Sequence, residues 1–223
     1  MTQAGAIPWR AQTRAEMAAR VAADIPEGAY VNLGIGMPTL VSRHLPPGRD
    51  VILHSENGIV GMGPAPASGV VDPSLVNASK EPVTLLSGAS ITDHVTSFAM
   101  MRGGHIDLTV LGAFQVSRNG DLANWDTGVA GSIPAVGGAM DLVAGARRVH
   151  VLMEHRTRDG RPKIVEACTY PLTGMGVVDR IYTDVATIDV ADGALRVIWI
   201  VDGLSFAALQ AMTGAPLDDA LGT

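Results

Sequence analysis

The sequence predicts an α/β fold, in which a single domain holds a mixed, largely parallel sheet flanked by helices. Short apolar runs end in glycine turns and lead into helical segments, a pattern typical of parallel βαβ units. Two pairs of apolar runs are instead joined by Asn-Gly or Asp-Gly, which favours hairpins and therefore antiparallel strands. The chain has 223 residues, of which 47% are hydrophobic, so it can bury one sizeable core.

The first helix is predicted by its capping signals. Thr13 and Glu16 form a capping box, apolar residues follow at nearly helical spacing, and the Pro-Glu-Gly run at 26–28 ends the helix. We interpret residues 1–223 as one domain, with 1–12 and 218–223 expected to be flexible at its ends.

Strands and helices alternate through the rest of the chain. Each expected strand is a run rich in Val, Ile and Leu between turn residues. The expected strands cover 30–33, 51–54, 83–86, 107–111 and 148–153, the helices 38–45, 92–102, 139–144 and 204–212, and the hairpins 114–123 and 181–201. The Pro/Gly-rich loop at 63–73 is compatible with a lid, with a partner contact or with an ordinary surface loop.

Glu56 stands where a predicted buried strand ends. The apolar run at 51–54 leads directly into Ser-Glu-Asn-Gly at 55–58. Ligands of open α/β sheets bind outside the carboxyl ends of strands, and a glycine beside the acid lets a bulky substrate approach the backbone. Glu56 is therefore a candidate catalytic carboxylate, and the competing interpretation is a solvated loop glutamate.

Two further glycine sites point to backbone donors for an anion or an oxyanion. Gly34 and Gly36 follow the strand at 30–33, and Gly137 with Gly138 opens an apolar helical stretch. The first pair lacks the third glycine and the later acidic residue of the dinucleotide-binding fingerprint. Ordinary turns are the alternative, because the chain has 26 glycines.

Charge and composition exclude several classes of partner. The formal net charge is −6 and no Lys/Arg cluster is present, which argues against nucleic acid and anionic membranes. The densest basic stretch, 156–163, is expected to form a solvated hairpin. No 18-residue apolar run and no signal-like segment is found, so we expect a cytoplasmic protein without a membrane span.

The cysteine and the histidines suggest no further chemistry. Cys168 is the only cysteine, and its strand-like run has no feature that would lower a thiol pKa, so we expect a small buried core residue. The six histidines lack ligand spacing on one helix face, and no metal site is expected.

Six motifs in order carry a resemblance to a known family. They are V-N-L-G-I-G-M-P (31–38), S-E-N-G (55–58), R-G-G-H (102–105), G-D-L-A-N-W (120–125), G-G-A-M-D-L-V (137–143) and E-A-C-T-Y-P-L-T-G (166–174). Together they resemble the B subunit of the 3-oxoacid coenzyme A-transferases over residues 13–217. The resemblance implies a CoA-transferase-like fold and makes Glu56 the nucleophile.

The same resemblance implies the other site residues. Gly138 would supply an oxyanion donor. The residues expected to contact substrate or CoA are Asn32, Gly34, Gly36, Asn57, Gly58, Gly137 and Ala139. No metal and no cofactor is implied, because the coenzyme A thioester is itself the substrate.

A glutamate suits this chemistry because its ordinary pKa of about 4.3 leaves it ionised at neutral pH, so it needs no general base. Its attack on an acyl-CoA gives an acyl-glutamyl anhydride and CoA thiolate. The thiolate then attacks the glutamyl carbonyl, which releases the acid and leaves a glutamyl-CoA thioester, and the incoming acid reverses both steps. One backbone donor typically stabilises such an oxyanion by about 2.7 to 4 kcal/mol, and a dry, closed site is expected.

The resemblance also implies a partner and a substrate. The family needs an A subunit, usually in an α2β2 heterotetramer, so the chain alone should be inactive. Residues 124–136 depart from the N-W-M-I-P-G-K pattern of acetoacetate-type members and are similar to the form in 3-oxoadipate CoA-transferases of the β-ketoadipate pathway of aromatic-compound catabolism. Those enzymes use succinyl-CoA. Arg102, His94 and His105 are candidates for binding the far carboxylate of such a dicarboxylic acceptor.

Three alternatives remain open from the sequence. The acceptor could be acetoacetate instead of 3-oxoadipate. The chain could instead be a non-catalytic ligand-binding module, since one fold hosts unrelated functions, and such a module would not need Glu56. Hydrolysis of acyl-CoA would require water at the thioester. The apolar or small residues expected near Glu56 argue against it: Met37, Val60, Met62, Ala65 and Pro66.

Overall fold

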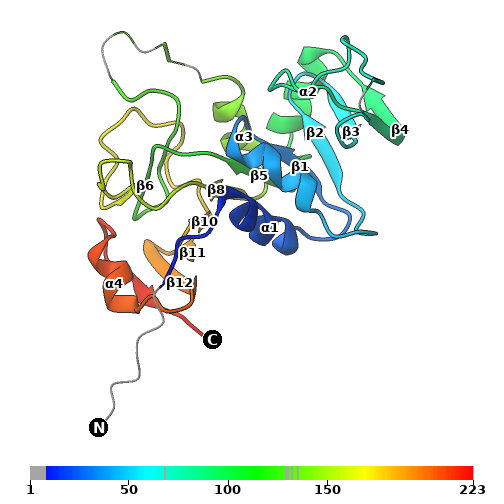
Figure 1. The fold of residues 1–223 in the computed structure, drawn as a ribbon. Coiled ribbons are helices and arrows are strands. Elements are labelled where there is room, and N and C mark those ends of the chain that lie inside the picture. The colour runs from blue at the N-terminus through cyan, green and yellow to red at the C-terminus, as the bar shows by residue number, and fades with distance from the viewer. Residues whose placement is uncertain (1–8, 68, 129–130, 132, 135, 223) are drawn as a thin grey trace.

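A ten-stranded mixed sheet forms the centre of the molecule (Figure 1). The computed structural model describes residues 9–67, 69–128, 131, 133–134 and 136–222. The strands of this sheet are β1 (Tyr30–Leu33), β2 (Ile52–Ser55), β3 (Ile59–Met62), β4 (Leu85–Ile91), β5 (Leu108–Leu111), β8 (Val149–Leu152), β10 (Arg180–Tyr182), β11 (Ala186–Ala191), β12 (Ala194–Ile200) and β13 (Asp218–Asp219).

The sheet is parallel at its centre and has antiparallel pairs on both sides of it, and the edge strand β13 pairs parallel with β12. Its order is β13-β12-β11-β10-β8-β5-β1-β2-β3-β4, and β10, β8, β5, β1 and β2 run parallel. Val31 of β1 pairs with Leu53 on one side and Leu108 on the other. Central strands that are covered on both faces need apolar side chains on both faces, which explains these short Val/Leu/Ile runs. The α/β class and the mixed sheet agree with the sequence prediction.

Helices cover both faces of the sheet. The first face carries α1 (Arg14–Asp24) and the 3₁₀ helix η1 (Met37–His44), which bury side chains such as Met17, Val31 and Leu53. The opposite face carries α2 (His94–Arg102) and α3 (Ala139–Gly145). The last helix, α4 (Phe206–Ala211), lies beside β11 and β12 at one end of the sheet, far from β3 and β4 at the other (Figure 1).

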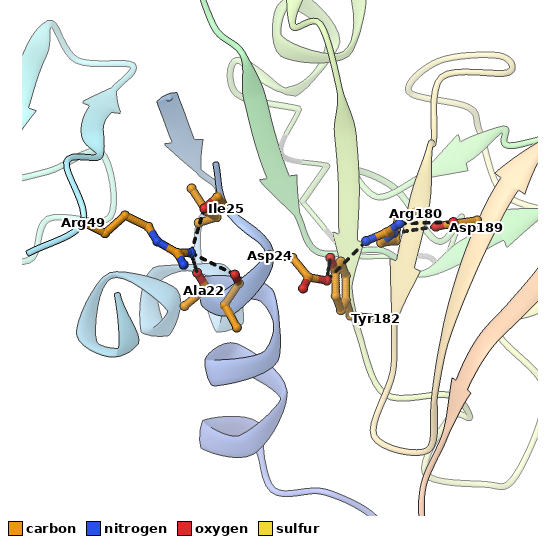
Figure 2. A network of polar contacts seen from close by, with 8 residues as sticks. Ala22, Asp24, Ile25, Arg49, Arg180, Tyr182 and Asp189 are labelled. Atoms are coloured by element: carbon orange, nitrogen blue, oxygen red, sulfur yellow. Dashed lines mark hydrogen bonds and ion pairs between the residues drawn. The ribbon is translucent and has the colours of Figure 1, made fainter. Parts of the chain in front are cut away.

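Polar contacts attach α1 to the rest of the domain (Figure 2). The last turn of α1 contains no basic residue, so Arg49 supplies one: its Nη1 donates to the carbonyls of Ala22, Ala23 and Ile25 at 3.3, 2.8 and 2.8 Å. Among the described residues, the Ala23 and Ile25 carbonyls accept no backbone hydrogen bond, and the Ala22 carbonyl accepts only from the Ile25 N–H at 3.4 Å. Figure 2 also shows Asp24 accepting from the Tyr182 hydroxyl at 2.7 Å, which joins the helix end to β10.

The segment after Glu56 contains a strand that the sequence analysis did not assign. Residues 59–62 form β3, which pairs antiparallel with β2, and the strand expected at 83–86 is β4 at 85–91, on the outer side of β3. Gly61 has a φ of +84°, and the register shifts between Val60 and Met62, so this glycine marks a β-bulge and not a loop. Glu56 therefore lies in a hairpin turn.

Two other expected elements have different forms in the structure. The helix expected at 38–45 is the 3₁₀ helix η1, in which Thr39 and Ser42 hydroxyls donate to carbonyls three residues earlier. The strand expected at 181–190 is divided into β10 and β11, because the Thr183 backbone and hydroxyl bond to Ala186 in a tight turn. Residues 218–219, in the tail expected to be flexible, form β13 on β12.

A small second sheet lies beside the main one. It contains β7 (Leu122–Ala123), β6 (Gln115–Ser117) and β9 (Ile164–Val165), and β6 and β7 form the hairpin expected at 114–123. The basic hairpin is confirmed by the Arg156–Pro162 bridge. Cys168 follows β9 in a bend and is half-buried, so its placement in the core was wrong. Burial raises the pKa of its thiol to about 11, so the thiol stays protonated and unreactive.

Arg49→Met is expected to lower the free energy of unfolding by about 1 to 3 kcal/mol, because three carbonyls at the end of α1 lose a charged donor. Urea unfolding of the purified protein measures the change. Arg158→Met, at an exposed arginine of the basic hairpin, is the control and should change it by less than about 0.5 kcal/mol. Equal effects of the two substitutions would show that Arg49 does not cap the helix.

Candidate active site

A cavity of about 550 Å³ opens at the carboxyl ends of the central strands, where the loops after β1, β2 and β5 meet the start of α3. Its volume lies in the range of small-molecule sites. Most lining side chains are apolar, among them Met37, Leu111 and Phe114. Five residues that the sequence assigned to the site line this cavity: Gly34, Glu56, Gly137, Gly138 and Ala139.

The turn that carries Glu56 is closed by hydrogen bonds and by a glycine. The Gly58 N–H donates to Ser55 O at 2.9 Å, and the Thr92 N–H donates to Gly58 O at 2.8 Å. Gly58 has a φ of +110°, and a Cβ there would collide with the Thr92 carbonyl. Only glycine fits this position, so the turn holds Glu56 in one place at the end of β2.

The Glu56 carboxylate lies directly against the Gly138 backbone. A Cβ added at Gly138 would overlap Glu56 Oε2 and would also lie 3.3 Å from the Phe98 ring. Gly138 is the N-cap of α3. Within the described chain its N–H donates to no protein acceptor, whereas the Ala139 N–H donates to Val136 O at 3.1 Å. Gly138 therefore offers the free donor beside the carboxylate.

A buried chain of hydrogen bonds supports Glu56 from behind. Asn32 Nδ2 lies 3.1 Å from His54 Nδ1, and His54 Nε2 lies 3.1 Å from Ser97 Oγ. Ser97 Oγ donates to the Glu56 carbonyl at 2.9 Å. Since the serine proton is used on that carbonyl, Ser97 accepts from His54, and the protonated ring nitrogen is Nε2. His54 Nδ1 then accepts from the Asn32 amide.

The protonation state of His54 agrees with this assignment of hydrogen-bond donors and acceptors. Burial lowers the pKa of His54 to about 4, so the ring is neutral at neutral pH. A neutral ring has one donor and one acceptor, as the chain of hydrogen bonds requires. Asn32 thus lies behind the turn, not on the cavity wall, and its backbone neighbour Val31 faces the opposite side of the sheet.

The remaining predicted residues have structural positions. Gly34 packs so closely on β5 that a Cβ would lie 2.9 Å from the Leu111 side chain. Gly36 caps η1 with a φ of +88° and does not line the cavity. The Asn57 side chain turns away and donates to Val76 O at 2.8 Å. Their expected contacts with substrate stay predictions.

The apolar residues expected near Glu56 divide between two cavities. Met37 lines the cavity that holds Glu56, whereas Met62 and Ala65 line a separate cavity of about 320 Å³ beside β2. The loop at 63–73 begins beside this second cavity, where the Gly63 N–H donates to Thr84 O at 2.8 Å and the Thr84 N–H donates to Pro64 O at 3.0 Å. The apolar character of the first cavity comes instead from the loops after β1 and β5.

The cations expected to bind a far carboxylate do not line the cavity. Arg102 Nε pairs with Asp141 at 2.5 Å, and His94 stacks on Phe98 with ring centroids 4.2 Å apart. His105 lies near Gly103, outside the lining. The lining includes Lys163 instead, from the segment expected to form a solvated hairpin. No spacing or motif in the sequence places Lys163 near Glu56.

No cluster of three or more potential metal-ligating side chains occurs among the described residues. The same part of the chain has no helix that is long and apolar enough to cross a membrane. The segment 124–136, which suggested the substrate, lies partly outside the described residues, at 129–130, 132 and 135. Its ends, Asn124 and Val136, line the cavity.

Comparison with known families agrees with this geometry. A family model described as Coenzyme A transferase matches residues 14–202. The chain belongs to the coenzyme A transferase family. It is 59% identical over 208 residues to the B subunit of the 3-oxoadipate CoA-transferase of Acinetobacter baylyi, a match that covers 93% of this chain and 96% of that protein.

More distant relatives share the same core. A Bacillus subtilis protein, named as the probable B subunit of a succinyl-CoA:3-ketoacid coenzyme A transferase, is 46% identical over 205 residues, which cover 92% of this chain and 94% of that one. An acyl-CoA transferase apoenzyme from Escherichia coli O157:H7 matches in structure with a TM-score of 0.74 at 20% identity. The match covers 96% of this chain but 42% of that longer chain, and it shows the common fold.

Gly138→Ala is expected to lower kcat of the enzyme, assembled with its A subunit, by roughly 100-fold, because the new Cβ displaces the Glu56 carboxylate. The thermal midpoint should hardly change, since the displaced group is the end of a flexible side chain. Gly112→Ala is the matched control: Gly112 lines the same cavity, and its added Cβ meets no atom within 4 Å. Equal losses in both variants would contradict the close approach at Gly138.

The free energy of unfolding is expected to fall as the pH is lowered from about 6.5 towards 4. Burial lowers the pKa of His54, His150 and His155 to about 4, so the unfolded chain takes up protons in this range that the folded chain does not. Each histidine contributes up to about 1.4 kcal/mol per pH unit. Urea unfolding at pH 7, 6 and 5 measures the slope, and a constant value would contradict neutral buried rings.

Proposed function

We propose that this chain is the B subunit of a CoA-transferase that moves CoA from succinyl-CoA to 3-oxoadipate through a glutamyl-CoA thioester on Glu56. The observation that carries the proposal is the Glu56 carboxylate lying against Gly138, whose N–H has no partner among the described residues, in a mostly apolar cavity. The Acinetobacter and Bacillus relatives support the reaction class and the type of subunit. No cofactor is required beyond the thioester that serves as substrate.

The proposed mechanism assigns one role to each group. Glu56 attacks the thioester carbonyl, and the Gly138 N–H donates to the oxyanion that forms. The thiolate of CoA then attacks the resulting glutamyl carbonyl, and a second oxyanion forms at the same donor. A preorganised backbone donor in an apolar cavity is effective because it needs no reorganisation as the charge develops.

Two observations support 3-oxoadipate over acetoacetate as the acceptor. The 3-oxoadipate relative is 59% identical, against 46% for the 3-ketoacid relative. Residues 124–136 have the form that resembles 3-oxoadipate enzymes, and both ends of this segment line the cavity. Asn124 is held there by Nδ2, which donates to Gly112 O at 3.1 Å. This proposal places the enzyme in the cytoplasm, in aromatic-compound catabolism.

The proposed partner is an A subunit in an α2β2 heterotetramer. Both relatives are named as B subunits, and one end of the sheet has exposed apolar side chains suited to a protein contact. They belong to β4 and the start of α2: Leu86, Ile91 and Val95 are 48%, 64% and 78% exposed. An edge strand with such exposed apolar side chains is usually covered by another segment or another chain.

Borohydride trapping tests the nucleophile. The chain, co-expressed with its A subunit, is incubated with succinyl-CoA without acceptor, reduced, digested and examined by mass spectrometry. Conversion of Glu56 to the corresponding alcohol is expected in the wild type and not in Glu56→Gln. The chain without its partner should show neither conversion nor turnover. An unmodified Glu56 in a complex that still consumes succinyl-CoA would mean hydrolysis or another nucleophile. Separately, a larger kcat/KM for acetoacetate than for 3-oxoadipate would overturn the proposal that 3-oxoadipate is the acceptor.

A further inference from the structure

The cavity that holds Glu56 contains a single cationic side chain among the described residues. Its charged lining consists of Glu56, Glu154 and Lys163, and the other lining residues are apolar side chains, glycines and Asn124. A lysine in a mostly apolar cavity beside a candidate nucleophile has a cost in desolvation. The desolvation of such a charge is usually compensated by a bound group of opposite charge.

The backbone on both sides holds Lys163 in place. The Lys163 N–H donates to His155 O at 3.2 Å, and Lys163 O accepts from the Val116 N–H at 2.9 Å. Ile164, the next residue, is fully buried in β9. The backbone of Lys163 is therefore fixed between the basic hairpin and the small sheet, at a position where the residue lines both the cavity of Glu56 and a neighbouring cavity beside Arg14 and Asp184.

The acidic groups around Lys163 are already engaged. Glu154 shares the cavity wall, but its Oε1 pairs with Arg14 at 2.7 Å. Asp184 accepts from the His155 N–H at 2.7 Å. Among the described residues, neither acid forms an ion pair with Lys163, and its ammonium makes no hydrogen bond. Burial lowers the pKa of Lys163, while both acids favour its charged form.

We propose that Lys163 binds the far carboxylate of a dicarboxylic acyl group while the other end of that group reacts at Glu56. The inference rests on the proposed function and deepens it by naming the residue that selects dicarboxylic over monocarboxylic substrates. One cation serves both partners of the reaction, because the succinyl donor and the 3-oxoadipate acceptor each carry a second carboxylate. Because the ammonium forms no ion pair or hydrogen bond among the described residues, a substrate carboxylate can be its direct partner.

Two thioesters that differ only in the far carboxylate test this role. Formation of the glutamyl-CoA thioester is measured for 3-oxoadipyl-CoA and for 3-oxohexanoyl-CoA, with the chain assembled with its A subunit. The wild type should prefer 3-oxoadipyl-CoA. Lys163→Met should lower kcat/KM for 3-oxoadipyl-CoA by roughly 10- to 100-fold, and change that for 3-oxohexanoyl-CoA by less than about threefold. Lys163→Arg should keep most of the preference.

Arg161→Met is the matched control. Arg161 lies two residues away, is exposed, pairs with Asp159 at 2.7 Å and does not line the cavity. It should leave the ratio of the two kcat/KM values unchanged. Co-purification with the A subunit and the thermal midpoint check folding, and Lys163→Gln replaces Lys163→Met if the latter does not assemble.

The outcomes separate the two proposals. A ratio that is unchanged in Lys163→Met, or equal losses for both thioesters, would overturn the role of Lys163 while leaving the reaction at Glu56 intact. A wild type that forms no glutamyl thioester from either compound would overturn the proposed function, and the role of Lys163 with it. A wild type that uses both equally well would show that no group selects the far carboxylate.

Discussion

The hydrogen bond from Ser97 to the Glu56 carbonyl joins the candidate nucleophile to helix α2, and the arrangement of the site depends on it. The same helix packs against α3, where Gly145 leaves no room for a Cβ beside the Met101 carbonyl. The start of α3 is Gly138. One helix therefore positions both the carboxylate and the backbone donor, and a shift of α2 would move them together. The contacts of α2 thus keep the Glu56 carboxylate close to Gly138, although the backbones of these two described residues are not bonded to each other.

Neutral hydrogen bonds provide this support. Charged groups behind Glu56 would change the electrostatics of the carboxylate as well as its position. His54 is buried and its pKa is lowered to about 4, so it passes one hydrogen bond from Asn32 to Ser97 without adding charge. In the proposed mechanism, a turn held by neutral donors leaves the stabilisation of the developing oxyanion to the Gly138 N–H. Neutral groups thus fix the position of Glu56, and a different group is left to stabilise the charge of the transition state. A site that is preorganised in this way stabilises the transition state more than the ground state.

The proposed nucleophile and the residue proposed to select the substrate come from different parts of the fold. The central sheet supplies Glu56 at the end of β2, and its parallel strands give this position little freedom. Lys163 comes from the start of β9 in the small sheet, and Asn124 follows β7 there. A scaffold of this kind can keep one reaction while its peripheral segments change the substrate. The ammonium of Lys163, which forms no ion pair or hydrogen bond among the described residues, is the feature on which the proposed second carboxylate site rests.

The sequence by itself determined the class of fold, the glutamate at a strand end and the glycine pair opposite it. These are local signals, since an apolar run, a turn and a helix start each lie within a few residues. Tertiary structure alone decided that 59–62 form a strand, because a bulge at Gly61 lets a glycine-rich segment pair with β2 and β4. It also brought His54 to Ser97, and Lys163 into the cavity of Glu56. These contacts join residues distant in sequence, and their formation depends on strand order, register and helix packing, which no local pattern encodes.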